Sequence, residues 1–117
     1  MVDRKRRLDC ANGIRKADIV LKHGKVLNVF TEEILEADVA ICGDTIVGVG
    51  SYEGEREIDC TGKYLVPGFL DAHMHIESSM VSPGELSKVL VQAGTTTIVA
   101  DPHEIVNAVS YTHLRAH

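Results

Sequence analysis

Aromatic side chains are scarce in this sequence of 117 residues: Phe, Tyr and Trp together make up 4% of the chain, and Trp is absent. Hydrophobic residues nevertheless make up 44%, so we expect an aliphatic core in a chain long enough for one ordinary domain. No apolar run approaches the roughly 18 residues of a membrane-spanning helix. The basic start is not followed by the apolar segment of a signal peptide. We therefore expect a cytoplasmic protein that does not engage a membrane.

Positive charge and cysteine are also limited. The formal net charge is −5 at pH 7, which disfavours nucleic acid as an electrostatic partner. The basic run at residues 4–7 is interpreted as a solvated N-terminal segment rather than a nucleic-acid patch. The cysteines are Cys10, Cys42 and Cys60, an odd number at long spacings. This spacing is not typical of a disulfide framework or a Cys-x-x-Cys metal site, and it indicates reduced thiols.

Residues 17–63 contain short apolar segments separated by turn residues, after a charged segment at residues 1–16 that could form a short helix. Strands are predicted at residues 19–21, 26–30, 36–42, 45–49 and 57–60. The pair His23-Gly24 is typical of a turn, which would separate the first two strands. Turn signals at such close spacing favour a small antiparallel β module.

The next pattern is a single strand, predicted over residues 65–76. If the chain is extended there, side chains alternate between two faces. One face is apolar and consists of Leu70, Ala72, Met74 and Ile76. The other face carries Asp71, His73 and His75, with Glu77 just beyond. Two imidazoles on one face, roughly 6–7 Å apart at Cβ, can both lean onto one metal ion.

A helix and a further strand follow. Ser82 is the predicted N-cap, with Pro83 at the first helical position and Glu85 at the capping-box position. Gly94 is predicted to end the helix. Residues 95–100 are β-branched and apolar, which indicates a buried strand. A strand, a helix and a strand in this order predict a parallel βαβ unit with a right-handed crossover.

Together these motifs resemble the start of an amidohydrolase-superfamily enzyme. The resemblance rests on the segment VPGFLDAHMH at residues 66–75, and three further segments make it narrower. These are IESSM at residues 76–80, GTTT at 94–97 and DPHEIVN at 101–107, which are similar to the adenine deaminase family. The resemblance covers residues 17–107.

The resemblance implies an α/β fold with a small β module: a composite β-sandwich part over residues 17–63, then the start of a metal-dependent (β/α)8 barrel over residues 64–109. A closed barrel takes roughly 200 residues or more, so this chain would hold only the first βαβ unit of a truncated barrel. Residues 110–117 depart from the family pattern and are predicted to be foreign to the fold. His113 and His117 are therefore excluded from the site.

The implied activity is hydrolytic deamination of adenine, a small-molecule substrate, to hypoxanthine and ammonia. Manganese or iron is the expected metal, with zinc as an alternative, and the longer parent enzyme could be homo-oligomeric. The chain alone is expected to be inactive. Two alternatives stay open: a dihydropyrimidinase- or dihydroorotase-like cyclic amide hydrolase, and a truncated β module that is not an enzyme.

The predicted metal ligands are His73 and His75, because neutral imidazole binds zinc, iron and manganese. A metal held in this way activates water for hydrolysis at neutral pH. Asp71 could fix a histidine tautomer by accepting a ring N–H, or could simply accept a neighbouring backbone N–H. Glu77 is a predicted catalytic residue that contacts the purine or relays protons, the alternative being a polar loop residue.

A second predicted catalytic cluster consists of Asp101, His103 and Glu104. These residues follow the second barrel strand, at the end where catalytic residues lie on this fold. The alternative is that Asp101 or Glu104 caps the next helix. His23 is interpreted as a surface residue. The glycines form no Gly-x-Gly-x-x-Gly or Walker pattern, so no nucleotide cofactor site is expected.

Overall fold

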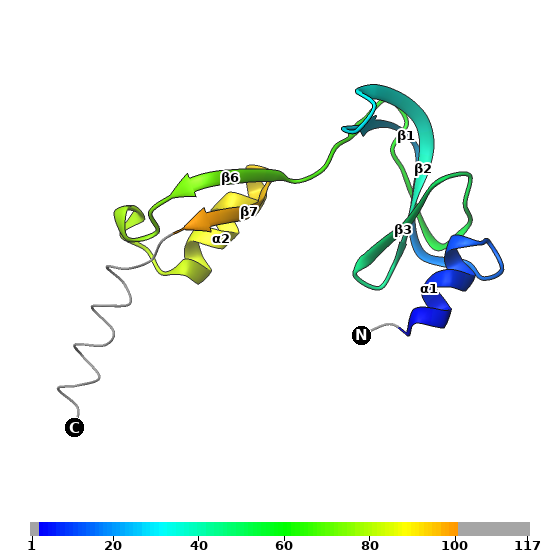
Figure 1. Cartoon of the computed structure of the whole chain (residues 1–117), viewed down its shortest axis with the longest axis horizontal. Coiled ribbons are helices and arrows are strands. Elements are labelled where there is room, and N and C mark those ends of the chain that lie inside the picture. Colours follow the sequence, from blue (N-terminus) through cyan, green and yellow to red (C-terminus); the bar gives the residue numbers. More distant parts are fainter. Residues whose placement is uncertain (1–2, 101–117) are drawn as a thin grey trace. The chain divides into compact units, whose positions relative to one another are not determined.

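The computed structural model describes residues 3–100, which fall into two compact units (Figure 1). The first unit ends at Pro67 and the second begins at Gly68. The predicted site residues Asp101, His103 and Glu104 lie outside the described residues, as does the segment 110–117 that we predict to be foreign. Within residues 3–100, neither α-helix is long and apolar enough to cross a membrane.

The first unit is one mixed β-sheet with a short helix. Its elements are α1 (Arg4–Ala11), β1 (Ala17–Asn28), β2 (Glu33–Cys42), β3 (Thr45–Gly50), β4 (Gly54–Asp59) and β5 (Tyr64–Leu65). The order is β3-β2-β1-β4, and β5 also pairs with β1. Neighbours β1, β2 and β3 are antiparallel, whereas β4 and β5 run parallel to β1. The expectation of a purely antiparallel module is therefore wrong, because the chain crosses after β3 to the far side of β1.

Strand β1 continues through the position where a turn was expected. His23-Gly24 is not a hairpin turn but a break in register between β1 and β2, located between Leu21 and Gly24. His23 has a φ of 58°, and its N–H donates to Asp38 Oδ1 at 3.0 Å. An extra residue of this kind bends a strand without ending it. After the bend, the partner of β1 changes from β4 to β5.

A buried carboxylate, Asp38, connects three parts of the first unit. The residue is 5% exposed. Its side chain accepts from Lys22 Nζ at 2.6 Å and from the backbone N–H groups of His23 and Tyr52 at 3.0 and 3.2 Å. Burial opposes the charge, but the Lys22 ammonium and the two N–H groups outweigh it and hold the pKa of Asp38 at about 2. Asp38 therefore stays ionised and joins β2 to β1 and to the turn after β3. Beside it lies a small apolar core centred on Val20.

The second unit pairs two parallel strands through one helix. Its elements are β6 (Phe69–Met74), η1 (Glu77–Ser79), α2 (Pro83–Gln92) and β7 (Thr95–Ala100), and β6 pairs in parallel with β7. The single strand expected over residues 65–76 is wrong: its first part is β5 of the other unit, and β6 ends at Met74. The break falls at Pro67, which has no N–H to donate to a ladder.

Helix α2 begins and ends as the sequence predicts. The Ser82 hydroxyl accepts from the Glu85 N–H at 3.4 Å, and Pro83 occupies the first turn. The helix gives way to Gly94, whose φ of 90° suits a residue without a side chain. The helix thus leads directly from the loop after β6 into β7.

Candidate metal-binding site

Two histidine rings meet at the end of β6. His73 is the next-to-last residue of β6, and His75 directly follows the last residue of the strand. Their ring centroids are 5.1 Å apart and their planes cross at 72°. Two imidazoles this close can direct nitrogen atoms toward one ion, which is the arrangement that the His-x-His spacing predicts.

A carboxylate lies beside the second ring. His75 Nδ1 is 3.2 Å from Glu77 Oε1, and the Glu77 side chain is only 11% exposed. In the tautomer with the proton on Nδ1, the Nδ1–H group would donate a hydrogen bond to this carboxylate, and Nε2 would carry the free lone pair. Histidines that bind metals commonly hold their second nitrogen in this way, because the carboxylate fixes the tautomer and raises the basicity of the ligand nitrogen. The sequence predicted a functional Glu77, and the structure places it against a predicted ligand.

Asp71 has a local backbone contact instead. Its Oδ1 accepts from the backbone N–H of His73 at 3.0 Å. Of the two interpretations of Asp71, this contact corresponds to the structural one, in which the carboxylate holds the chain rather than a ring. Asp71 therefore fixes the backbone from which the His73 side chain extends.

The two histidines are the predicted metal ligands that lie within the described residues. Within residues 3–100, no group of three or more His, Cys, Asp or Glu side chains is placed to hold an ion, so a site that includes His73 and His75 would need further donors. Met74 pairs with Ala100 in the parallel ladder, and both strands therefore end at the same edge of the sheet. The predicted cluster Asp101, His103 and Glu104 follows Ala100 in the sequence.

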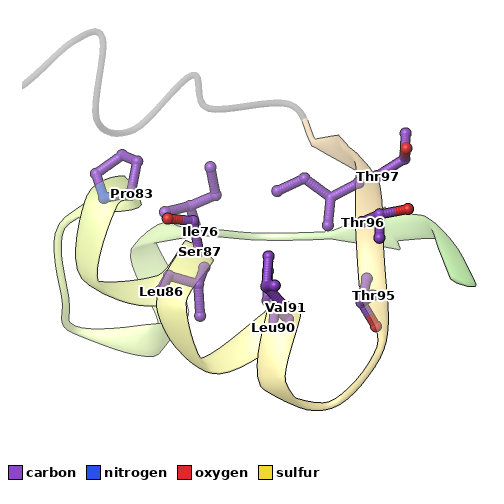
Figure 2. A pocket seen from close by; sticks show the side chains of 10 residues that line it. Ile76, Pro83, Leu86, Ser87, Leu90, Val91, Thr95, Thr96 and Thr97 are labelled. Atoms are coloured by element: carbon purple, nitrogen blue, oxygen red, sulfur yellow. The ribbon is translucent and has the colours of Figure 1, made fainter. Parts of the chain in front are cut away.

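An apolar crevice in the second unit is separate from the histidines. Figure 2 shows it between the side chains of α2 and those of β7, with Ile76 at its margin. Its volume is about 120 Å³. Leu86, Leu90 and Thr95 line it, and neither His73 nor His75 does. We interpret the crevice as the packing seam between helix and strand, not as a substrate site.

Comparisons with known proteins agree with the pattern of motifs. Residues 64–116 match the amidohydrolase family; this range includes most of the tail predicted to be foreign, which stays a prediction. The chain is 54% identical over 101 residues to an adenine deaminase of Clostridium acetobutylicum and 55% identical over 101 residues to one of Bacillus pumilus. Each alignment covers 86% of this chain and 18% of the relative. The chain thus spans about a fifth of the length of these curated relatives.

Solved structures show the same kind of fold. The chain is 26% identical, with a TM-score of 0.60, to an N-acyl-D-glutamate deacylase of Bordetella bronchiseptica complexed with zinc and a phosphonate inhibitor. That match covers 74% of this chain and 19% of the deacylase. A D-aminoacylase structure described by its binuclear metal centre is 31% identical, with a TM-score of 0.62, over 72% of this chain and 18% of the aminoacylase.

Proposed function

The chain belongs to the amidohydrolase family, and from this premise we propose that it is the N-terminal part of a metal-dependent enzyme that hydrolyses adenine to hypoxanthine and ammonia. Identities of 54% and 55% to adenine deaminases support the substrate. The observation that carries the proposal is the contact between the His73 and His75 rings at 5.1 Å, with Glu77 beside the second ring.

The fold that we propose for the longer protein is a composite β-sandwich joined to a (β/α)8 barrel. The five-stranded sheet of residues 17–65 would be one layer of the sandwich, and β6, α2 and β7 would be the first βαβ unit of the barrel. The parallel pairing of β6 with β7 supports this assignment. In such barrels, catalytic residues lie at the C-terminal ends of the strands, and the two histidines lie at that end of β6.

We assign the following roles in the proposed hydrolysis to residues of this chain. His73 and His75 would hold a divalent ion, manganese or iron, with zinc as the alternative. When bound, the ion would lower the pKa of water and make a nucleophile available at neutral pH. Glu77 would accept a hydrogen bond from the Nδ1–H group of His75, so that Nε2 of His75 stays available as the ligand atom. Asp101, His103 and Glu104 are proposed to complete the catalytic set.

The proposed partner is the small molecule adenine, and the proposed location is the cytoplasm. The net charge of −5 gives no attraction to nucleic acid. The three cysteines are free thiols, which agrees with a reducing compartment.

A chimera tests this function because the chain covers only part of its relatives. The aligned part of the Clostridium acetobutylicum enzyme would be replaced by the 101 matching residues of this chain. We expect the chimera to bind metal and to release hypoxanthine from adenine. His73→Ala and His75→Ala should lower metal content and activity together, by roughly 100-fold or more, and Glu77→Gln by roughly 10- to 100-fold.

His23→Asn is the matched control. His23 lies in the first unit with an exposed ring, and Asn tolerates its positive φ, so metal content and activity should be unchanged. Full metal content with full activity in the His73→Ala chimera would contradict the assigned ligands. A folded, metal-loaded chimera that does not convert adenine would contradict the assigned substrate.

A further inference from the structure

Two of the three cysteines lie side by side inside the first unit. Cys10 is on α1 and Cys42 ends β2, and both are fully buried. Their Sγ atoms are 3.5 Å apart, although the residues are 32 positions apart in the sequence. The spacing gave no sign of this contact, because only the docking of α1 onto the sheet creates it. Neither thiol belongs to the proposed metal site, which lies in the other unit.

Charged contacts hold the two thiols in place. Arg6 of α1 pairs with Asp18 of β1, and Asp18 also accepts from the Gly43 N–H at 2.7 Å. Gly43 is the residue directly after Cys42, so this carboxylate links the helix to the end of β2. Arg7 lies 3.5 Å from Asp44 in the same turn. The thiols therefore face each other because α1 is fixed at this turn.

We propose that Cys10 and Cys42 are an oxidation site, at which a two-electron oxidant such as hydrogen peroxide closes a disulfide between α1 and the end of β2. One sulfur, as the thiolate, attacks a peroxide oxygen; the O–O bond breaks, a sulfenic acid forms and water leaves after protonation. The second sulfur attacks the sulfenic sulfur, forms the S–S bond and releases a second water. Two thiols lose two hydrogens, and peroxide is reduced to two waters.

The geometry requires only a small movement for this bond. A disulfide has an S–S length of about 2.05 Å, so the sulfurs must approach by about 1.5 Å. Burial, and to a lesser extent the hydrogen bond with Cys42, raises the pKa of the Cys10 thiol. The thiol is therefore protonated and unreactive while α1 is packed against the sheet. Reaction therefore depends on brief opening of α1, a helix of eight residues. Reclosure brings the oxidised sulfur back to its partner.

Trypsin separates the three cysteines and makes the pairing readable. Cleavage after Lys and Arg places Cys10 in the peptide of residues 8–15, Cys42 in that of residues 26–56 and Cys60 in that of residues 57–63. The whole chain would be treated with hydrogen peroxide without denaturant, alkylated in denaturant, digested and analysed by mass spectrometry. We expect peptide 8–15 to be joined to peptide 26–56 with a loss of about 2 Da, and peptide 57–63 to be alkylated.

The same treatment in urea is the control. In an unfolded chain, shorter loops close more readily, so Cys42 should pair with Cys60, 18 positions away, more often than with Cys10. A Cys60→Ser variant should still form the cross-link between Cys10 and Cys42. In Cys10→Ser the remaining Cys42 should be recovered alkylated, and in Cys42→Ser the remaining Cys10 should be. Three alkylated cysteines in the peroxide-treated folded chain would overturn the proposal. So would the same mixture of pairs with and without urea.

Discussion

Replacing Asp38 by Asn tests whether one buried carboxylate holds the first unit together. The substitution keeps the shape of the side chain and removes its charge. Asp38 has a pKa of about 2 instead of the ordinary 3.8. This difference corresponds to about 2–3 kcal/mol of folding free energy at pH 7. The Asn amide group would also direct N–H donors toward Lys22, His23 or Tyr52, so we expect a loss of about 2–3 kcal/mol.

The same carboxylate predicts how stability depends on pH. A pKa that is lower in the folded state stabilises the fold above the unfolded value of 3.8 and stops doing so as the pH falls through about 2. Stability of the first unit should therefore decline between about pH 5 and pH 2. Asp59, whose pKa is lowered by its hydrogen bonds from Thr61, should add a smaller decline in the same direction. The Asp38→Asn variant should show the smaller decline alone.

The measurement is urea unfolding followed by circular dichroism at several pH values between 7 and 3. Hydrogen exchange of the amides of residues 17–28 at pH 7 adds a readout specific to β1. Asp44→Asn is the matched control, because that side chain is 78% exposed and lies 3.5 Å from Arg7; its effect should stay within about 0.5 kcal/mol. The reasoning is refuted if Asp38→Asn unfolds at the same urea concentration as the unaltered chain at pH 7.

Three further outcomes are expected. Gly54→Ala should cost about 1–3 kcal/mol, because its Cβ would lie 2.8 Å from Val20 Cγ2 and 2.9 Å from the Arg56 carbonyl oxygen. In α2, a Cβ added at Gly84 would meet nothing within 4 Å, so Gly84→Ala should be neutral or stabilising. Equal losses of thermal stability in the two variants would count against this reasoning. The chain alone should not convert adenine to hypoxanthine with added manganese or iron(II), since its described part supplies only two ligands; turnover near roughly one per second would refute this.

Local signals were enough to predict α2 and β7 of the second unit from the sequence, but not the bounds of β6. Ser82 and Pro83 mark the start of α2 and Gly94 marks its end. Ser82 acts through a capping hydrogen bond, Pro83 through its fixed φ and Gly94 through its positive φ. The β-branched run that follows forms β7 as predicted, but the expectation that this strand is buried is wrong: its residues are exposed or only partly buried. A helix cap or a helix stop depends on residues within one helical turn, so it can be predicted from neighbouring positions in the sequence.

The first unit depended on partners that are distant in the sequence. His23-Gly24 has the composition of a turn, but the backbone there is held by Asp38, 15 positions further on. The parallel pairing of β4 and β5 with β1 likewise follows from a crossover that alternation cannot reveal. The contact between Cys10 and Cys42 has the same origin. In each case the residue types were visible in the sequence and the partner was not.

The candidate site depends partly on local signals and partly on partners that are distant in the sequence. The spacing of His73 and His75 predicts a pair of neighbouring rings if both lie in one extended segment; β6 ends between them at Met74, and the ring centroids still lie 5.1 Å apart. The Glu77 contact is equally local, two positions from His75. If the two histidines bind a metal, its further ligands would come from other segments, because residues 3–100 bring no third His, Cys, Asp or Glu into a group with them. The pairing of Met74 with Ala100 brings the end of β7 to the edge where the histidines lie. The residues that follow Ala100 are therefore the first place to substitute when the remaining ligands are sought.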